Sequence, residues 1–363
     1  MFGLSEKQVE SAIKKYIDPY TKQDFVTAKT VRTIKIDGER VTVDILLGYP
    51  AKSRISEIQD ELQARVLALK GVSEAHIKIR SQVDGHVAQK GVTAIPQVKN
   101  VIAVASGKGG VGKSTVAVNL ALALSAEGAS VGILDADIYG PSQPRMLGIT
   151  GKPESRDGKS MEPMLSYEIQ AMSIGFLIEE ETPMIWRGPM VTQALEQLSK
   201  DTNWKKLDYL IIDLPPGTGD IQLTLAQRIP VTGALIVTTP QDIALLDARK
   251  AVKMFEKVEI PVLGVVENMS THICSECGHE EHIFGKGGAE RMAADYDIDY
   301  LGGIPLDMRI REDVDNGRPT VVTDPDGPIA ETYKSVARHL GAKISLGKKD
   351  HSTKFPGIVV QNN

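Results

Sequence analysis

The feature that most constrains this chain is an apolar run that leads into a glycine-rich loop and then into a helical pattern. The run covers residues 101–105, the loop reads Ser-Gly-Lys-Gly-Gly-Val-Gly-Lys-Ser-Thr over 106–115, and apolar periodicity follows over 116–124. The spacing fits G-x-x-x-x-G-K-[ST], and strand, loop and helix occur in the order that this pattern needs. The sequence therefore predicts a phosphate-binding loop for a nucleoside triphosphate.

Each loop position has a physical role in holding phosphate. Glycines let the backbone turn its N–H groups toward phosphate oxygens, Lys113 brings a positive charge to the β- and γ-phosphates, and the Ser114 hydroxyl can hold Mg²⁺. A second lysine, Lys108, directly follows the first glycine. We expect the nucleotide to be bound by Gly107, Lys108, Gly109, Gly110, Val111, Gly112, Lys113, Ser114 and Thr115.

Composition argues against several classes of protein. The chain has 363 residues, enough for about two domains. Its net charge of −5 gives no reason to expect a broad surface for nucleic acid or anionic membranes. No apolar run reaches the roughly 18 to 20 residues of a membrane span, and the first residues lack the pattern of a signal peptide. We therefore expect a cytoplasmic protein with no nucleic-acid and no membrane partner.

Residues 1–82 are expected to form a small α+β domain. Periodicity predicts a helix, two strands, a helix and a third strand, over 6–16, 30–36, 40–47, 55–69 and 73–79. Asp37-Gly38 is a hairpin signal between the first two strands, because both residues tolerate a positive φ. Periodicity then disappears, so residues 83–98 are expected to be a linker.

Residues 99–345 alternate short apolar strands with helical patterns. The strand patterns cover 101–105, 130–134, 207–212, 233–238 and 262–268. Strands that are apolar on both faces and separated by helices predict an α/β domain with a parallel sheet covered on both sides. Ligands of such sheets bind at the carboxyl ends of the strands. The last residues, 346–363, are expected to be a loosely held tail.

Three acidic residues follow two of these strands. Asp135 and Asp137 come after 130–134, and Asp213 comes after 207–212, directly before Leu-Pro-Pro-Gly-Thr-Gly. An apolar strand that ends in aspartate is typical of the acid that holds Mg²⁺ in phosphate-loop enzymes. We expect Ser114, Asp135 and Asp213 at the Mg²⁺ site and Asp137 to orient or polarise the attacking water, although Asp135 and Asp137 can exchange roles.

The chain's two cysteines, Cys274 and Cys277, lie in one C-x-x-C segment. Two thiolates supply half of a four-thiolate set, so a second copy of the chain can add its own pair and hold an iron-sulfur cluster across a two-fold axis. His279 and His282 can instead complete a local zinc site, although their spacing is shorter than the usual finger pattern. A redox dithiol and a pair of inert thiols also fit, and spacing does not decide among these four.

The loop with its extra Lys108 resembles the deviant Walker A loop of the MinD/ParA/Mrp (SIMIBI) class of dimerising P-loop ATPases. Within that class the chain resembles the Mrp/ApbC group of iron-sulfur carriers, and the matching segments occur in order. They are 135–142, 186–190, 213–220, 239–241, 267–270, Cys274-x-x-Cys277, 284–288 and 301–306. Segments 17–19 and 46–50 resemble a small domain of iron-sulfur assembly factors, but the reactive cysteine of some members is missing here.

The resemblance implies a slow, Mg²⁺-dependent ATPase that binds an iron-sulfur cluster and passes it to apo-proteins, with cluster scaffold proteins as further partners. It makes Lys108, Lys113, Asp137 and Asp213 the catalytic residues, with Lys108 reaching the partner's nucleotide in a homodimer. It also implies that Asn268 recognises the base and that the cysteines of both subunits hold a bridging 4Fe-4S cluster. A ParA/MinD-like positioning ATPase and a zinc-binding P-loop metallochaperone are the alternatives.

Overall fold

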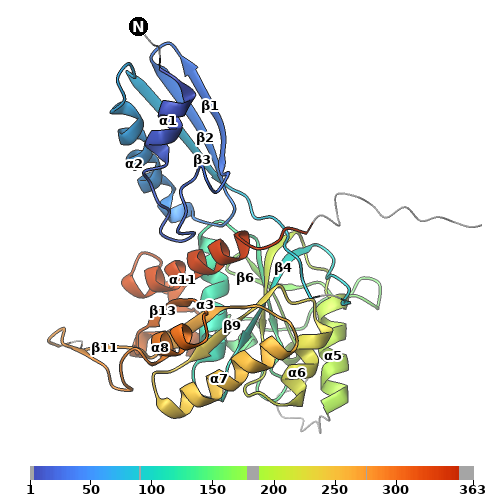
Figure 1. Cartoon of the computed structure of the whole chain (residues 1–363). Coiled ribbons are helices and arrows are strands. Elements are labelled where there is room, and N and C mark those ends of the chain that lie inside the picture. The colour runs from blue at the N-terminus through green and yellow to red at the C-terminus, as the bar shows by residue number, and fades with distance from the viewer. Residues whose placement is uncertain (1–3, 90, 178–187, 275, 351–363) are drawn as a thin grey trace, which may run out of the picture.

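The computed structural model of the chain describes residues 4–89, 91–177, 188–274 and 276–350. Its strands form a three-stranded sheet, an eight-stranded sheet and a two-stranded hairpin. Figure 1 shows the small sheet and its helices at one end of the larger body, with the large sheet as the second unit. None of the helices among the described residues is long and apolar enough to cross a membrane.

The small unit has the predicted order of helix, strand, strand, helix and strand. Its elements are α1 (Glu6–Ile13), β1 (Val31–Asp37), β2 (Arg40–Leu47), the short 3-10 helix η1 (Lys52–Arg54), α2 (Ile55–Leu67) and β3 (Glu74–Ser81). β1 is antiparallel to β2, and β2 is parallel to β3. Alternate β2 residues are buried, as are Ile58, Leu62 and Val66 of α2. The helix stripe therefore packs on one face of the sheet, as its spacing predicts.

The large sheet has the strand order β13-β10-β9-β4-β8-β5-β7-β6. Its strands are β4 (Val98–Ala105), β5 (Val131–Asp135), β6 (Met164–Ser166), β7 (Ile169–Ser173), β8 (Leu207–Asp213), β9 (Gly233–Thr238), β10 (Val262–Asn268) and β13 (Tyr300–Ile304). All neighbours are parallel except β6, which pairs antiparallel with β7. The carboxyl ends of the central strands therefore meet at one edge.

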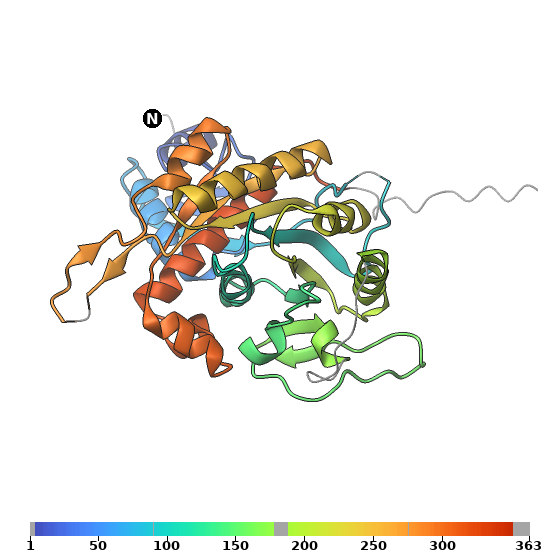
Figure 2. The ribbon, with the colours of Figure 1, turned by 90° about the horizontal axis from the view of Figure 1, so that it is seen from below.

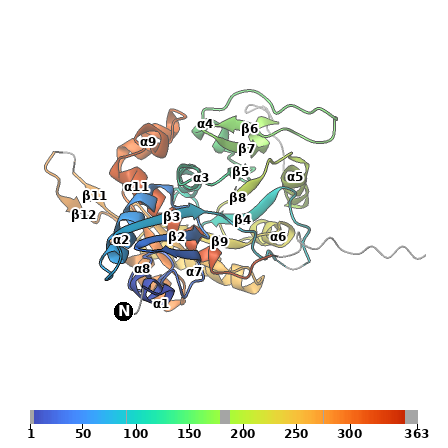
Figure 3. The ribbon, with the colours of Figure 1, turned by 90° about the horizontal axis from the view of Figure 1, so that it is seen from above.

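Helices cover both faces of this sheet, as Figures 2 and 3 show. One core joins Ile102 and Val104 to α3 (Lys113–Ala126) and α11 (Pro328–Ser345). The other core joins the alternate residues of β4 to α5 (Gly188–Asp201), α6 (Asp220–Arg228), α7 (Asp242–Lys257) and α8 (Gly288–Asp295). The shorter helices are α4 (Gln143–Met146), η2 (Ile174–Phe176), α9 (Met308–Asp315) and α10 (Thr320–Thr323). Burial on both faces explains why the predicted strands are apolar throughout.

The small unit contacts the large one at a buried ion pair of the large unit. Arg338 of α11 bonds to Glu127, which caps the carboxyl end of α3, with Nη1 2.6 Å from Oε1. From the small unit, Ser53 donates to the same carboxylate and Tyr20 accepts from Arg338 Nε at 2.6 Å. The small unit therefore rests on the far end of the helix that begins at the phosphate loop.

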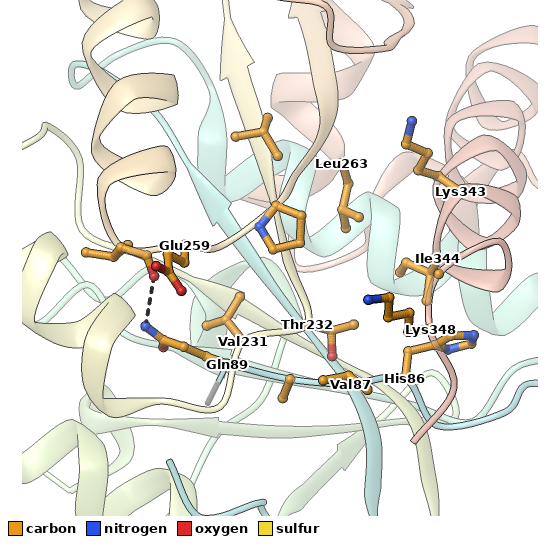
Figure 4. A pocket seen from close by; sticks show the side chains of 15 residues that line it. His86, Val87, Gln89, Val231, Thr232, Glu259, Leu263, Lys343, Ile344 and Lys348 are labelled. Atoms are coloured by element: carbon orange, nitrogen blue, oxygen red, sulfur yellow. Dashed lines mark hydrogen bonds between the residues drawn. The ribbon is translucent and has the colours of Figure 1, made fainter. Parts of the chain in front are cut away.

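A cavity of about 460 Å³ lies beneath the segment that joins the two units, and Figure 4 shows its lining. Gln89 lines the cavity, and its side chain donates to the carbonyl of Val258 at 3.1 Å. Val231 and Thr232 directly precede β9, so the cavity lies at the amino ends of the strands. The phosphate loop follows the carboxyl end of β4, which runs parallel to β9. The cavity is therefore at the opposite edge of the sheet from the predicted nucleotide site.

Candidate functional site

The phosphate loop joins β4 to α3 in a turn that needs glycine. Gly110 and Gly112 have φ angles of 82° and 80°, in the left-handed region that favours this residue. A β-carbon at Gly107 would overlap the backbone of Asp247, and one at Gly112 would overlap the side chain of Asn268. The glycines of the loop are therefore required by its backbone conformation and by the close approach of Asp247 and Asn268.

The remaining loop residues surround this turn. Gly109 is exposed, Val111 is buried, and Ser114 and Thr115 lie half-exposed in the first turn of α3. The Ser106 hydroxyl donates to the Lys108 carbonyl at 2.9 Å. The first N–H groups of α3 have no partner within the helix, and the dipole of the helix favours an anion such as phosphate at this end.

The structure brings the predicted acids to the base of this loop. Asp135 ends β5 and Asp213 ends β8, and the two residues are paired in register on neighbouring strands. Both are fully buried. Lys113, itself buried, forms an ion pair with Asp213 and lies 3.1 Å from the Ser114 hydroxyl. Sequence reasoning placed the two acids at one sheet edge, and the strand order makes them neighbours.

Burial changes the proton affinity of these acids. Burial, followed by the negative charge of Asp213, raises the pKa of Asp135 to about 7. Burial also raises the pKa of Asp137, while the charge of Lys113 lowers it. A site that penalises negative charge in this way favours a bound cation. The hydroxyl of Ser114 and the carboxylates of Asp135 and Asp213 are oxygen donors of the kind that Mg²⁺ prefers, so the residues fit that ion.

Gln143 is a site residue that sequence reasoning missed. Its backbone N–H donates to Asp135 at 3.0 Å, and its side chain donates to Asp213 at 2.9 Å and to the Ser114 carbonyl at 3.1 Å. Ser173 on β7, also missed, donates to Asp135 at 3.1 Å. Neither residue belongs to a recognisable pattern, because each reaches the site through chain folding rather than through spacing.

The loop after β8 lies beside the phosphate loop. The N–H of Gly217 donates to the Ser106 carbonyl at 3.0 Å. The side chain of Gln222 at the start of α6 donates to the carbonyl of Pro216. Lys108 forms no ion pair with another described residue, and its action on a partner subunit stays a prediction. The Pro-Pro-Gly segment is therefore next to where the terminal phosphate is expected.

Asn268 connects the phosphate loop to the cysteine segment. It is buried at the carboxyl end of β10, and its side-chain Nδ2 donates to the Val111 carbonyl at 2.9 Å. The predicted contact of Asn268 with a base stays a prediction. The chain then leads through Ser270, whose N–H donates to the Ile304 carbonyl at 2.9 Å, toward Cys274.

The cysteines lie in a hairpin that projects from the body, between β11 (His272–Ile273) and β12 (Glu280–Glu281), as Figures 1 and 3 show. Both thiols are free, Cys277 is exposed, and Cys274 is partly exposed. The Cys274 N–H donates to the His279 carbonyl at 2.9 Å, which closes the turn. Hydrogen bonds from the backbone of Cys277 and Glu276 lower the pKa of the Cys274 thiol. A thiolate is the form that binds a metal.

The local zinc set of cysteines and histidines is not assembled. His282 Nδ1 lies 3.1 Å from the Ser270 carbonyl, and His279 faces Glu281 at 3.8 Å. Across the described ranges, no three side chains of the metal-binding types gather at one point. Of segment 186–190, Trp186 and Arg187 lie outside the described residues, and Met190 on α5 is half-exposed.

Comparison with known proteins agrees with this architecture. Residues 97–341 match the family described as ParA, NUBPL iron-transfer P-loop NTPase, and residues 6–78 match a family described as iron-sulfur cluster assembly protein. An iron-sulfur cluster carrier protein of Escherichia coli K12 is 48% identical over 93% of this chain and 91% of its own length.

Solved structures confirm the predicted fold class. A nucleotide-binding protein from Archaeoglobus fulgidus in complex with ADP is 39% identical, covers 64% of this chain and 90% of its own, and has a TM-score of 0.55. The cell division ATPase MinD of Pyrococcus furiosus, 23% identical over 66% of this chain and 97% of its own, shares the fold with a TM-score of 0.51. The chain belongs to the NUBPL iron-transfer P-loop NTPase family.

Proposed function

We propose that this chain binds iron-sulfur clusters and transfers them to target apo-proteins, with ATP binding and slow hydrolysis as the switch. The observation that carries the proposal is one connected unit. Asn268 at the end of β10 contacts the phosphate loop, and the hairpin that follows this strand carries a pair of free thiols. The names and the similarity of the carrier relatives support the same function.

The residues of the site have distinct roles in this proposal. Lys113 leaves Asp213 to bind the β- and γ-phosphates, and Asp137 orients the attacking water. Mg²⁺, held by Ser114, Asp135 and Asp213, would supply positive charge to the phosphate oxygens. Lys108 reaches the nucleotide of the partner subunit, so hydrolysis needs a homodimer. Binding of the nucleotide must favour one dimer arrangement for this cycle to drive cluster release.

The cluster is cargo shared by two subunits. Cys274 and Cys277 of each copy would together supply the four thiolates of a 4Fe-4S cluster. The projecting hairpin gives this pair access to a second copy and to a client protein. We place the protein in the cytoplasm with apo-proteins and cluster scaffolds as partners, and we assign no nucleic acid or membrane. Residues 1–82, 83–98, 99–345 and 346–363 serve as small domain, linker, carrier domain and tail.

Replacing both cysteines by serine is expected to abolish cluster binding. Protein reconstituted without oxygen should contain iron and sulfide and absorb visible light, whereas the Cys274→Ser/Cys277→Ser variant should contain neither, because serine is a poor ligand for the cluster irons. The measurements are iron, sulfide and zinc content and the visible spectrum.

The matched control is His279→Ala/His282→Ala, which lies in the same hairpin. This variant should keep the cluster, because neither imidazole is expected to be a ligand. Zinc without sulfide in the native protein, lost in the histidine variant, would contradict the proposal. An unchanged iron content in the cysteine variant would do so equally.

A further inference from the structure

We infer that Gln143 is the positioning residue of the Mg²⁺ site, through which the two strand-end acids and the phosphate loop are held together. This inference rests on the proposed Mg²⁺-dependent binding of nucleotide. Gln143 begins α4 and is 1% exposed. Its hydrogen bonds reach three separate parts of the chain: Asp135 at the end of β5, Asp213 at the end of β8, and Ser114 at the start of α3. No other amide side chain among the described residues bonds to these acids.

The two buried carboxylates of the site need hydrogen-bond donors that carry no charge. Asp135 and Asp213 are buried neighbours, and Lys113 is the one cation that pairs with either of them in the described chain. When Lys113 turns to the phosphates, Asp213 keeps the hydrogen bond from Gln143 Nε2 at 2.9 Å. The neutral side-chain amide donates to Asp213 and the backbone N–H of the same residue donates to Asp135, so both carboxylates are held in place without added positive charge that would compete with a divalent ion.

The amide oxygen of Gln143 is available to a water of the Mg²⁺ shell. Gln143 Oε1 is buried and has no hydrogen-bond partner among the described residues, and the same holds for the hydroxyl of the preceding Ser142. An unpaired acceptor in a buried position is costly, so a native protein normally supplies a donor. Mg²⁺ usually keeps several of its waters when it binds with a nucleotide. A water of that shell is a donor that this amide oxygen can accept from.

A purely structural reading assigns Gln143 only to the tethering of α4. The two readings differ in one measurable quantity, the gain in nucleotide affinity that Mg²⁺ provides. If Gln143 positions the Mg²⁺ site, removing its amide should reduce this gain and leave affinity in chelator nearly unchanged. If it only tethers α4, affinity should fall by the same factor with and without Mg²⁺.

The test is calorimetric titration of the full chain with ADP, once with Mg²⁺ and once with a chelator. In Gln143→Met, which keeps length without the amide, the Mg²⁺-dependent gain should fall by about 10- to 100-fold, the loss expected for a hydrogen bond to a charged group. Gln143→Asn keeps an amide, but its side chain is too short to reach Asp213. It should therefore show the same loss of the Mg²⁺-dependent gain, and it replaces the methionine variant in the test if that variant does not fold.

Gln170→Met is the matched control, because this buried glutamine on β7 bonds to the backbone of Lys205 and not to the acids. It should keep the full gain. An unchanged gain in both Gln143 variants, or an equal loss with and without Mg²⁺, would overturn the inference. Native protein that binds ADP with no gain from Mg²⁺ would instead refute the proposed Mg²⁺ dependence, and the inference with it.

Discussion

Lys113→Met is expected to lower ATP affinity by about 100-fold, because the phosphates lose the lysine that is proposed to bind them in a buried site. The ammonium of Lys113 is buried beside Asp213 and Ser114, at the base of the phosphate loop. Hydrolysis should fall below detection for the same reason. Titration with ATP and phosphate release at saturating ATP measure the two effects separately.

The same variant is expected to be less stable without nucleotide, by about 3–5 kcal/mol, because Asp213 loses the cation that pairs with it while buried next to Asp135. Lys108→Met is the control, since Lys108 forms no ion pair with a described residue. It should keep its stability without nucleotide, whereas hydrolysis, which needs Lys108 at the partner's nucleotide, should be lost. Normal ATP affinity in Lys113→Met would contradict the assignment of this lysine.

Much of the fold follows from the sequence because the central strands are buried on both faces. All five strand patterns predicted for the large sheet correspond to strands in the structure. The strands of this sheet that were not predicted are β6, β7 and β13, which lie at or near its edges. β7 carries Gln170 in a run of five residues, and β13 contains Gly302 and Gly303, so neither shows a clear apolar pattern.

The candidate site divides in the same way. The phosphate loop, Asp135 and Asp213 were predicted because each lies at a strand end, and strand ends meet in a parallel sheet. Gln143 could not be predicted, because its contacts depend on how the chain turns back after β5. The C-x-x-C segment was recognised from its spacing, but its place in a hairpin between β11 and β12 is visible only in the structure.

The placement of Asn268 gives the two sites a physical connection. Its side chain donates to the phosphate loop, and the chain from Asn268 to Cys274 is held to β13 and its following loop by backbone hydrogen bonds. Met269 lies between them with a φ of 57°, a conformation that costs energy for a residue other than glycine. The phosphate loop and the cysteines are thus joined by a short segment that side-chain and backbone hydrogen bonds hold in place.

The buried ion pair of the large unit, at its boundary with the small unit, is expected to be the second large contribution to stability. Arg338 is 1% exposed and Glu127 is fully buried, and the pair lies between α11 and the end of α3. Ser53 and Tyr20 of the small unit complete the hydrogen bonds of the two charges, and the Tyr20 ring lies 5.2 Å from the guanidinium carbon. Removing one charge leaves the other buried without a counter-charge.

Arg338→Met is therefore expected to lower the free energy of unfolding by about 3–5 kcal/mol, measured by urea denaturation of the full chain. The matched control is Glu331→Gln, because Glu331 pairs with the same guanidinium but is 51% exposed. That change should cost less than about 1 kcal/mol, as is usual for exposed pairs. Adding Glu127→Gln to Arg338→Met should recover part of the loss, since the unpaired buried charge is then gone. Equal losses in Arg338→Met and Glu331→Gln would contradict the large contribution assigned to the buried pair.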